Sequence, residues 1–212
     1  HPHHSKGEVY IVHNGIIENH QELRTTLKAL GYNFESETDS EVIAHLIHAK
    51  LNDKSSLAEA VKEAVKDLEG TYALGAIHIR EPQVVVAARR GSPLVLGLKD
   101  NEFFIGSDIS PIIKYTQNII YLNDNEMAII NESKYSIKSV NKDVILPRKV
   151  EKIDYKIDDF DKGKFKYFMH KEIHEQSLTV TNTLKSRSTT SSVLLHGLSE
   201  YWAEIKEAER IY

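Results

Sequence analysis

The sequence has 212 residues, of which 41% are hydrophobic and 27% are charged, enough to fold one domain and part of a second. Its net charge of -4, with acidic and basic residues interspersed, argues against a nucleic-acid partner, and no apolar run approaches the ~20 residues needed to cross a bilayer. It contains no cysteine, which excludes disulfides, thiolate metal sites and a thiol nucleophile within these residues. We therefore expect a soluble, cytoplasmic protein.

The first informative stretch joins a β-rich run, Val9–Val12, to the pair Asn14 and Gly15. We interpret it as a strand that delivers this pair to an edge. The Asn14 side-chain amide and the Gly15 backbone N–H are two donors suited to the negative oxygen of an acyl-transfer intermediate. The same dipeptide is also the commonest signal for a hairpin turn. However, residues 18–22 are polar and open a helix, so they make a poor second strand.

Three amphipathic helices are expected next. The first spans residues 21–30, and the other two begin at segments with capping-box spacing, Thr38–Glu41 and Ser56–Glu59. The third helix is expected to end at Gly70. In the second and third helices, some residues are predicted to face the core of the domain. They are Val42, Ile43, Leu46, Ile47, Leu51, Ala60, Val61, Ala64, Val65 and Leu68.

From Tyr72 onward the sequence changes to short β-rich runs separated by turn residues. Several of these runs are apolar on both faces, so the antiparallel sheet that they form must be covered on both sides. This pattern predicts a layered α+β domain. The expected strands are residues 72–79, 84–88, 94–98, 102–105, 119–122, 126–130 and 135–140.

The last part of the chain differs in texture from the β-rich region. Residues 149–164 are charged and are predicted to be a linker, in which Asp158, Asp159 and Asp161 are solvated. A long helix with one apolar stripe is expected from Phe165 to Leu184. A polar loop at residues 186–192 then leads to a last helical face, at residues 198–211.

Several segments in order along the chain resemble one family. They are residues 1–3 (HPH), 13–20 (HNGIIENH), 36–46 (SETDSEVIAHL), 89–97 (RRGSPLVLG), 104–108 (FIGSD) and 169–176 (MHKEIHEQ). This set resembles the glutaminase domains of glucosamine-6-phosphate synthases, which are class II, N-terminal-nucleophile glutamine amidotransferases that use fructose 6-phosphate. Because the resemblance covers essentially the whole chain, it is more specific than any single motif.

The resemblance implies the αββα sandwich of N-terminal-nucleophile hydrolases. It also implies a glutaminase domain at residues 1–150, a linker at 151–164 and the helical start of a sugar-isomerase domain at 165–212. Implied partners are glutamine, the sugar-isomerase domain of the same polypeptide and further copies in a homo-oligomer. No cofactor and no metal are implied.

The resemblance also assigns roles to four residues. Asn14 and Gly15 match the oxyanion-hole pair, Asp39 matches the residue that binds the α-ammonium group of glutamine, and His1 matches a histidine near the bound glutamine. For Asp39 the alternative is a helix cap shared with Thr38, and both roles can hold together.

The family carries an N-terminal cysteine as its nucleophile, and no cysteine is present here. We therefore expect the chain to be a fragment that is inactive by itself, and its first residue not to be the true start. The alternative is a truncated or degenerate amidotransferase-like domain that acts as a non-catalytic binding module.

Other polar residues have simpler interpretations. His13, at the expected strand end, is interpreted as a satisfied, partly buried imidazole. His45 and His48 lie three residues apart on a helix but lack a visible third metal ligand. Ser107 and Asp108 lack the nucleophile-elbow context of a hydrolase triad.

Overall fold

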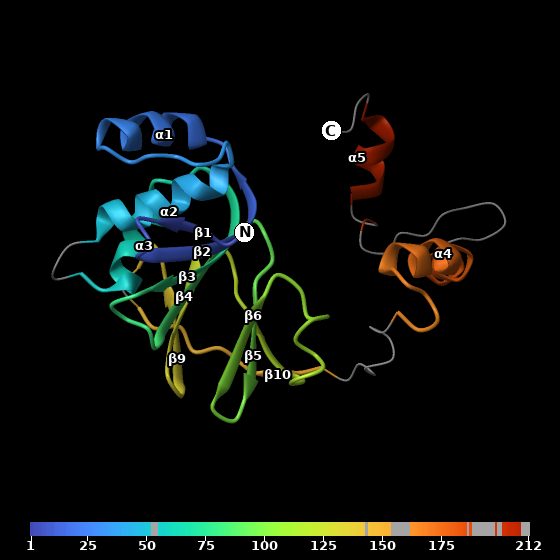
Figure 1. Ribbon diagram of the computed structural model, residues 1–212. Helices are drawn as coiled ribbons and strands as arrows, with labels where there is room; N and C mark the ends of the chain where they lie inside the picture. The colour runs from blue at the N-terminus through green and yellow to red at the C-terminus, as the bar shows by residue number, and fades with distance from the viewer. Residues whose placement is uncertain are drawn as a thin grey trace. The chain divides into compact units, whose positions relative to one another are not determined.

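The computed structural model describes residues 1–51, 55–142, 144–153, 162–185, 187, 198 and 201–208. The chain divides into two compact units, His1–Ile157 and Asp158–Tyr212, which are treated separately (Figure 1). The predicted linker is described only at residues 151–153 and 162–164. Its three aspartates, Asp158, Asp159 and Asp161, lie outside the described residues, as does most of the predicted polar loop at 186–192.

The first unit contains two antiparallel sheets and three helices. The six-stranded sheet has the order β1-β2-β3-β4-β8-β9, and the four-stranded sheet has the order β10-β7-β5-β6. The strands are β1 (His3–Ser5), β2 (Val9–Ile17), β3 (Gly70–His78), β4 (Val84–Arg90), β5 (Val95–Lys99), β6 (Glu102–Gly106), β7 (Asn118–Tyr121), β8 (Glu126–Asn131), β9 (Lys134–Ser139) and β10 (Glu151–Lys152). The helices are α1 (His20–Ala29), α2 (Asp39–Lys50) and α3 (Leu57–Lys66).

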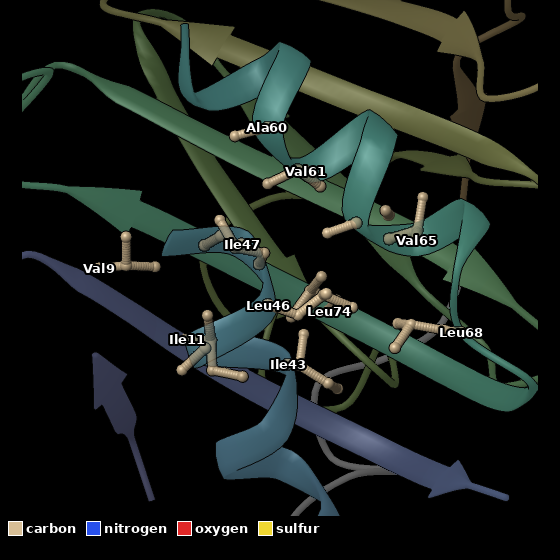
Figure 2. Packing of buried hydrophobic residues seen from close by; sticks show 14 of the residues in the cluster. Val9, Ile11, Ile43, Leu46, Ile47, Ala60, Val61, Val65, Leu68 and Leu74 are labelled. Atoms are coloured by element: carbon tan, nitrogen blue, oxygen red, sulfur yellow. The ribbon is translucent and has the colours of Figure 1, made fainter. Parts of the chain in front are cut away.

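The core lies in two layers on opposite faces of the six-stranded sheet. Alternation along β3 shows this, because Leu74 belongs to the cluster that packs against the helices whereas Ala73 belongs to the cluster between the two sheets. Figure 2 shows side chains of β2 and β3 meeting those of α2 and α3 on the helical face. The fold is therefore an α+β arrangement of helices, sheet and second sheet.

The strands predicted after residue 70 are confirmed to within two residues at each end, and their antiparallel pairing is confirmed. Two boundaries in the first unit were predicted wrongly. Strand β2 continues to Ile17 instead of ending before Asn14, and helix α3 ends at Lys66 instead of Gly70, which begins β3. The short strands β1 and β10 were not predicted because two or three polar residues carry no alternation to recognise.

The two predicted capping boxes have different outcomes. At the start of α3 both bonds of the box between Ser56 and Glu59 are present. At the start of α2 the box is absent, because Thr38 makes no side-chain cap bond. Glu41 instead accepts hydrogen bonds from the backbone of Glu35 and Ser36. The prediction that α2 begins at this point is nevertheless confirmed, and its predicted inward residues Val42, Ile43, Leu46 and Ile47 are buried. Leu51, the fifth, lies just past the end of α2 and is only partly buried.

The second unit is described mainly through two helices, α4 (Phe168–Leu184) and α5 (Trp202–Glu207). The helix predicted over residues 165–184 is confirmed from Phe168 onward, and α5 accounts for the described middle of the predicted face at 198–211. Neither these helices nor those of the first unit, in the part of the chain that the structure describes, has the length and apolar character needed to span a membrane.

Candidate functional site

The central feature of the site is the open part of strand β2. Strand β3 pairs with β2 over its whole length, whereas β1 pairs only with Val9–Ile11. Beyond Ile11, the side of β2 opposite β3 therefore faces no strand in the described part of the chain. Such an edge presents backbone N–H groups to whatever lies beside it.

The hydrogen-bond pattern identifies which N–H groups face this edge. The N–H of Glu18 donates to the carbonyl of Glu69 at 2.9 Å, and the carbonyl of Glu8 accepts from Ile79 at 3.0 Å. In an antiparallel ladder such pairs alternate, so the even-numbered residues of β2 bond to β3. The N–H groups of Gly15 and Ile17 consequently point to the open edge.

Asp39 lies at this edge. It is the first residue of α2, and its Oδ2 accepts a hydrogen bond of 2.8 Å from the N–H of Ile17. Its Oδ1 is 3.4 Å from the hydroxyl of Ser40. The carboxylate is half-buried and retains capacity to accept further bonds. The Asp39 side chain thus bonds to strand β2, and no side-chain cap bond is present at the start of α2.

Asn14 lies on the face of the sheet that is turned toward the second sheet, because it pairs with Ala73, a residue of the cluster between the two sheets. It is exposed and lines a pocket of about 230 Å³ together with His1, which also lies at the surface. Gly106, the last residue of β6, and Ser107, which follows it, also line this pocket. Asp39 does not line the pocket, so the four predicted residues fall into two adjoining groups, His1 with Asn14 in the pocket and Gly15 with Asp39 at the edge.

The Asn14-Gly15 pair is not a hairpin turn, because both residues are paired with β3 within a continuous strand. Gly15 has a φ of +147°, and a Cβ at this position would lie 2.2 Å from the carbonyl oxygen of Thr71. The glycine therefore allows β2 and β3 to approach closely here. This corrects the expectation that the pair lies at the end of its strand.

His13 is buried, and its Nδ1 lies 2.9 Å from the hydroxyl of Ser40. Burial lowers the pKa of the imidazole, although the charge of Asp39 works in the opposite direction. The burial agrees with the prediction, but the imidazole is not fully satisfied as predicted, because its Nε2 is buried with no hydrogen-bond partner among the described residues. The contact with Ser40, and the presence of Ser107 in the pocket, were not predicted, because neither residue carries a spacing that distinguishes it from an ordinary surface serine.

No group of three or more histidine, aspartate or glutamate side chains that could hold a metal ion is found among the described residues. His45 and His48 have other neighbours. The Nδ1 of His45 lies 2.8 Å from the hydroxyl of Ser5, and the Nδ1 of His48 lies 2.8 Å from the hydroxyl of Tyr32. Asp108 accepts a hydrogen bond of 2.7 Å from the N–H of Ser110.

These histidines make stability depend on pH. Burial lowers the pKa of His45 from its ordinary value of 6.5, although the Glu41 carboxylate opposes this, and burial also lowers the pKa of His48. Below pH ~6.5 the unfolded chain binds protons that the folded chain excludes, so we expect the free energy of unfolding to fall on acidification. Urea unfolding at about pH 7.5 and about pH 5.5 measures the difference in the free energy of unfolding between the two pH values. The His48→Gln variant should show a smaller difference. Equal stability at both pH values would contradict the expectation.

Two solved structures resemble the fold. One is the glutamine phosphoribosylpyrophosphate amidotransferase of B. subtilis, with a TM-score of 0.53 and 24% identity over 65% of this chain and 30% of that chain. The other is described as the allosteric regulatory enzyme of purine biosynthesis, with a TM-score of 0.54 and 24% identity over 66% of this chain and 30% of that chain. The α+β fold is thus that of the N-terminal-nucleophile amidotransferases.

The sequence comparisons narrow this class. The profile of the glutamine amidotransferase domain matches residues 1–114, and the chain belongs to this family. Two curated relatives are named glutamine--fructose-6-phosphate aminotransferase [isomerizing]. The one from Chlorobaculum tepidum is 40% identical over 100% of this chain and 35% of its own length. The one from Pseudomonas syringae pv. tomato is 43% identical over 97% of this chain and 33% of its own length. The chain thus spans about a third of these relatives.

Proposed function

We propose that this chain supplies the glutamine-binding and oxyanion-stabilising part of a glutaminase site. The observation that carries the proposal is the placement of Gly15 and Asp39 along one strand edge. Asp39 accepts a hydrogen bond from the N–H of Ile17. This N–H lies two residues beyond the N–H of Gly15, or roughly 7 Å along the strand. Four single bonds separate the amide carbon of glutamine from its α-nitrogen, a span of about 5 Å. One glutamine molecule therefore matches the spacing between the two groups.

The proposed chemistry is acyl transfer. A thiolate adds to the side-chain amide carbon of glutamine, and the carbonyl electron pair moves onto the oxygen. The Asn14 amide and the Gly15 N–H donate hydrogen bonds to this oxyanion, while Asp39 holds the α-ammonium group. The amide nitrogen takes up a proton, which the resemblance assigns to the α-amino group of the cysteine, and ammonia leaves as the carbonyl reforms. Water then hydrolyses the resulting thioester to glutamate, which frees the thiolate. The resemblance assigns the thiolate to an N-terminal cysteine, which is not among these 212 residues.

For the whole protein we propose the reaction named for its relatives, in which ammonia from glutamine and fructose 6-phosphate give glucosamine 6-phosphate. The support is the identity of 40 to 43% over essentially the full length of this chain. The sugar-isomerase domain, which is expected to begin at residues 165–212, would receive the ammonia. A homo-oligomer in the cytoplasm, where sugar phosphates occur, is part of the same proposal.

The absence of cysteine supports a second candidate, a binding module without catalysis. Two measurements on the natural protein, purified from its source, distinguish the two candidates. They are the intact mass and the N-terminal sequence. A polypeptide with a mass above 24.1 kDa and an N-terminal cysteine supports the glutaminase proposal. A mass of 24.1 kDa with His1 as the first residue supports the binding module.

The role of Asp39 is tested by Asp39→Asn. The substitution keeps an oxygen that can accept the Ile17 N–H but removes the charge that attracts the α-ammonium group. We expect the KM for glutamine and the Kd for L-glutamate, measured by calorimetry, to rise about 10- to 100-fold. Asp67→Asn is the matched control, because Asp67 pairs with Lys50 outside the site. Unchanged glutamate binding in Asp39→Asn would contradict the assignment.

A further inference from the structure

The loop of residues 35–38 leads directly into Asp39, and a buried polar network holds it. The loop is mostly exposed and has no regular secondary structure. Its position therefore depends on the side chains that bond to its backbone. The two that do so most extensively are Arg24 and Glu41, which come from different helices and are 5% and 4% exposed, respectively.

Arg24 holds the loop by donating hydrogen bonds to the loop's backbone carbonyl groups. Its Nη1 donates to the carbonyl of Ser36 at 2.9 Å, and its Nη2 donates to the carbonyl of Thr38 at 3.0 Å. The guanidinium also lies 4.2 Å from the centre of the Phe34 ring. The planar fork of arginine suits this contact, because two donors of fixed geometry reach two carbonyls on either side of Glu37.

Glu41 holds the loop by accepting hydrogen bonds from the loop's backbone N–H groups. One carboxylate oxygen accepts from Glu35 at 2.7 Å, and the other accepts from the N–H of Ser36 at 2.8 Å and from its hydroxyl at 2.6 Å. Burial acts to raise the pKa of this carboxyl, but these hydrogen bonds outweigh it and the pKa is lowered. His45 lies 3.5 Å from the carboxylate and connects it to Ser5 of strand β1.

Burying two charged groups is unfavourable unless hydrogen bonds compensate for the lost water. The loop backbone supplies such bonds to both side chains, although the Nε of Arg24 is buried with no hydrogen-bond partner among the described residues. What the two charged side chains provide is a fixed backbone for the four-residue loop before Asp39. We propose that Arg24 and Glu41 are positioning residues, which set the Asp39 carboxylate against the edge of β2 and thereby determine the affinity for the α-ammonium group. This inference rests on the proposed function.

The test is Glu41→Gln in the protein as its source produces it. The amide cannot accept from both loop N–H groups, so we expect the KM for glutamine and the Kd for L-glutamate to rise about tenfold. The kcat should change less than about twofold, because Glu41 does not touch the reacting atoms. Glu59→Gln is the matched control. Glu59 also accepts from the N–H and hydroxyl of a serine, Ser56, but it does so at the start of α3, away from the site.

A second set of variants distinguishes positioning from general destabilisation. If Glu41 acts through Asp39, Glu41→Gln should change affinity less than about twofold further in an Asp39→Asn background. If Glu41→Gln fails to fold, Ser36→Ala, which removes a single donor to Glu41, takes its place. A KM that rises no more than in Glu59→Gln, while Asp39→Asn raises it, would overturn the inference and leave the proposed function intact. If Asp39→Asn itself has no effect, it is the proposed function that fails.

Discussion

Asn14→Ala should lower the kcat of glutamine hydrolysis about 10²- to 10³-fold, the usual cost of removing one oxyanion-hole donor. The Asn14 side chain lies at the surface of the pocket that it lines with His1. Its truncation leaves the buried clusters untouched, so the free energy of unfolding should change by less than about 0.5 kcal/mol. The KM for glutamine should change little, because the lost bond forms mainly in the transition state. Steady-state release of ammonia, measured on the protein as its source produces it, checks both values.

Asn131→Ala is a suitable control, because Asn131 is also an exposed asparagine of a strand, at the end of β8. It should retain full activity. A kcat for Asn14→Ala that equals that of the control would mean that this side chain does not stabilise the oxyanion, and the glutaminase proposal would then rest on Gly15 and Asp39 alone.

Gly15→Ala should be the most damaging substitution in β2. The added Cβ would lie 2.2 Å from the carbonyl oxygen of Thr71 and 2.8 Å from its carbon, so β2 and β3 would have to separate locally. The φ of +147° is also unfavourable for alanine. We expect unfolding in urea to show a loss of about 3 kcal/mol or more, together with loss of glutamine hydrolysis.

Gly31→Ala separates the two causes. Gly31 has a φ of +84°, but nothing lies within 4 Å of the Cβ that alanine would add. Its substitution should therefore carry only the backbone cost, about 1 kcal/mol. If the two variants are equally stable, the contact with Thr71 is not what requires a glycine at position 15.

Strands β3 to β9 could be predicted from the sequence because turn residues separate them. The end of β2 could not be predicted in the same way. Asn14 and Gly15 favour a turn locally, but pairing with β3 over nine residues outweighs that preference. The long antiparallel partner, which begins at Gly70, is more than fifty residues away along the chain.

The two capping-box segments show a similar limit. Thr38–Glu41 and Ser56–Glu59 have the same spacing, but only the second forms a box. The difference lies in the residues before each helix, because the loop before α2 folds back and offers Glu41 three donors. Helix starts were therefore predictable, whereas the partners of the acidic residues depended on tertiary contacts.

The candidate site shows the same division. The residue types of Asn14 and Gly15 were compatible with an oxyanion hole as well as with a turn, and the resemblance decided between the two and supplied the expected role of Asp39. The bond between Asp39 and Ile17 could not be predicted from either, since it depends on how α2 packs against β2. The variants described above test the predicted roles of Asn14, Gly15 and Asp39, and the role of His1 stays a prediction.

The bond between Asp39 and Ile17 has one more consequence, which concerns solubility. A strand edge with free N–H groups beside exposed apolar side chains, such as Ile16 at 69% exposure, is a surface on which a foreign chain can add as another strand. At Ile17 the pairing position is already taken by a carboxylate, whose charge would have to be stripped of water before another backbone could approach. We therefore expect the Asp39 carboxylate to disfavour the addition of a foreign strand at this position, and a variant without the carboxylate to aggregate more readily.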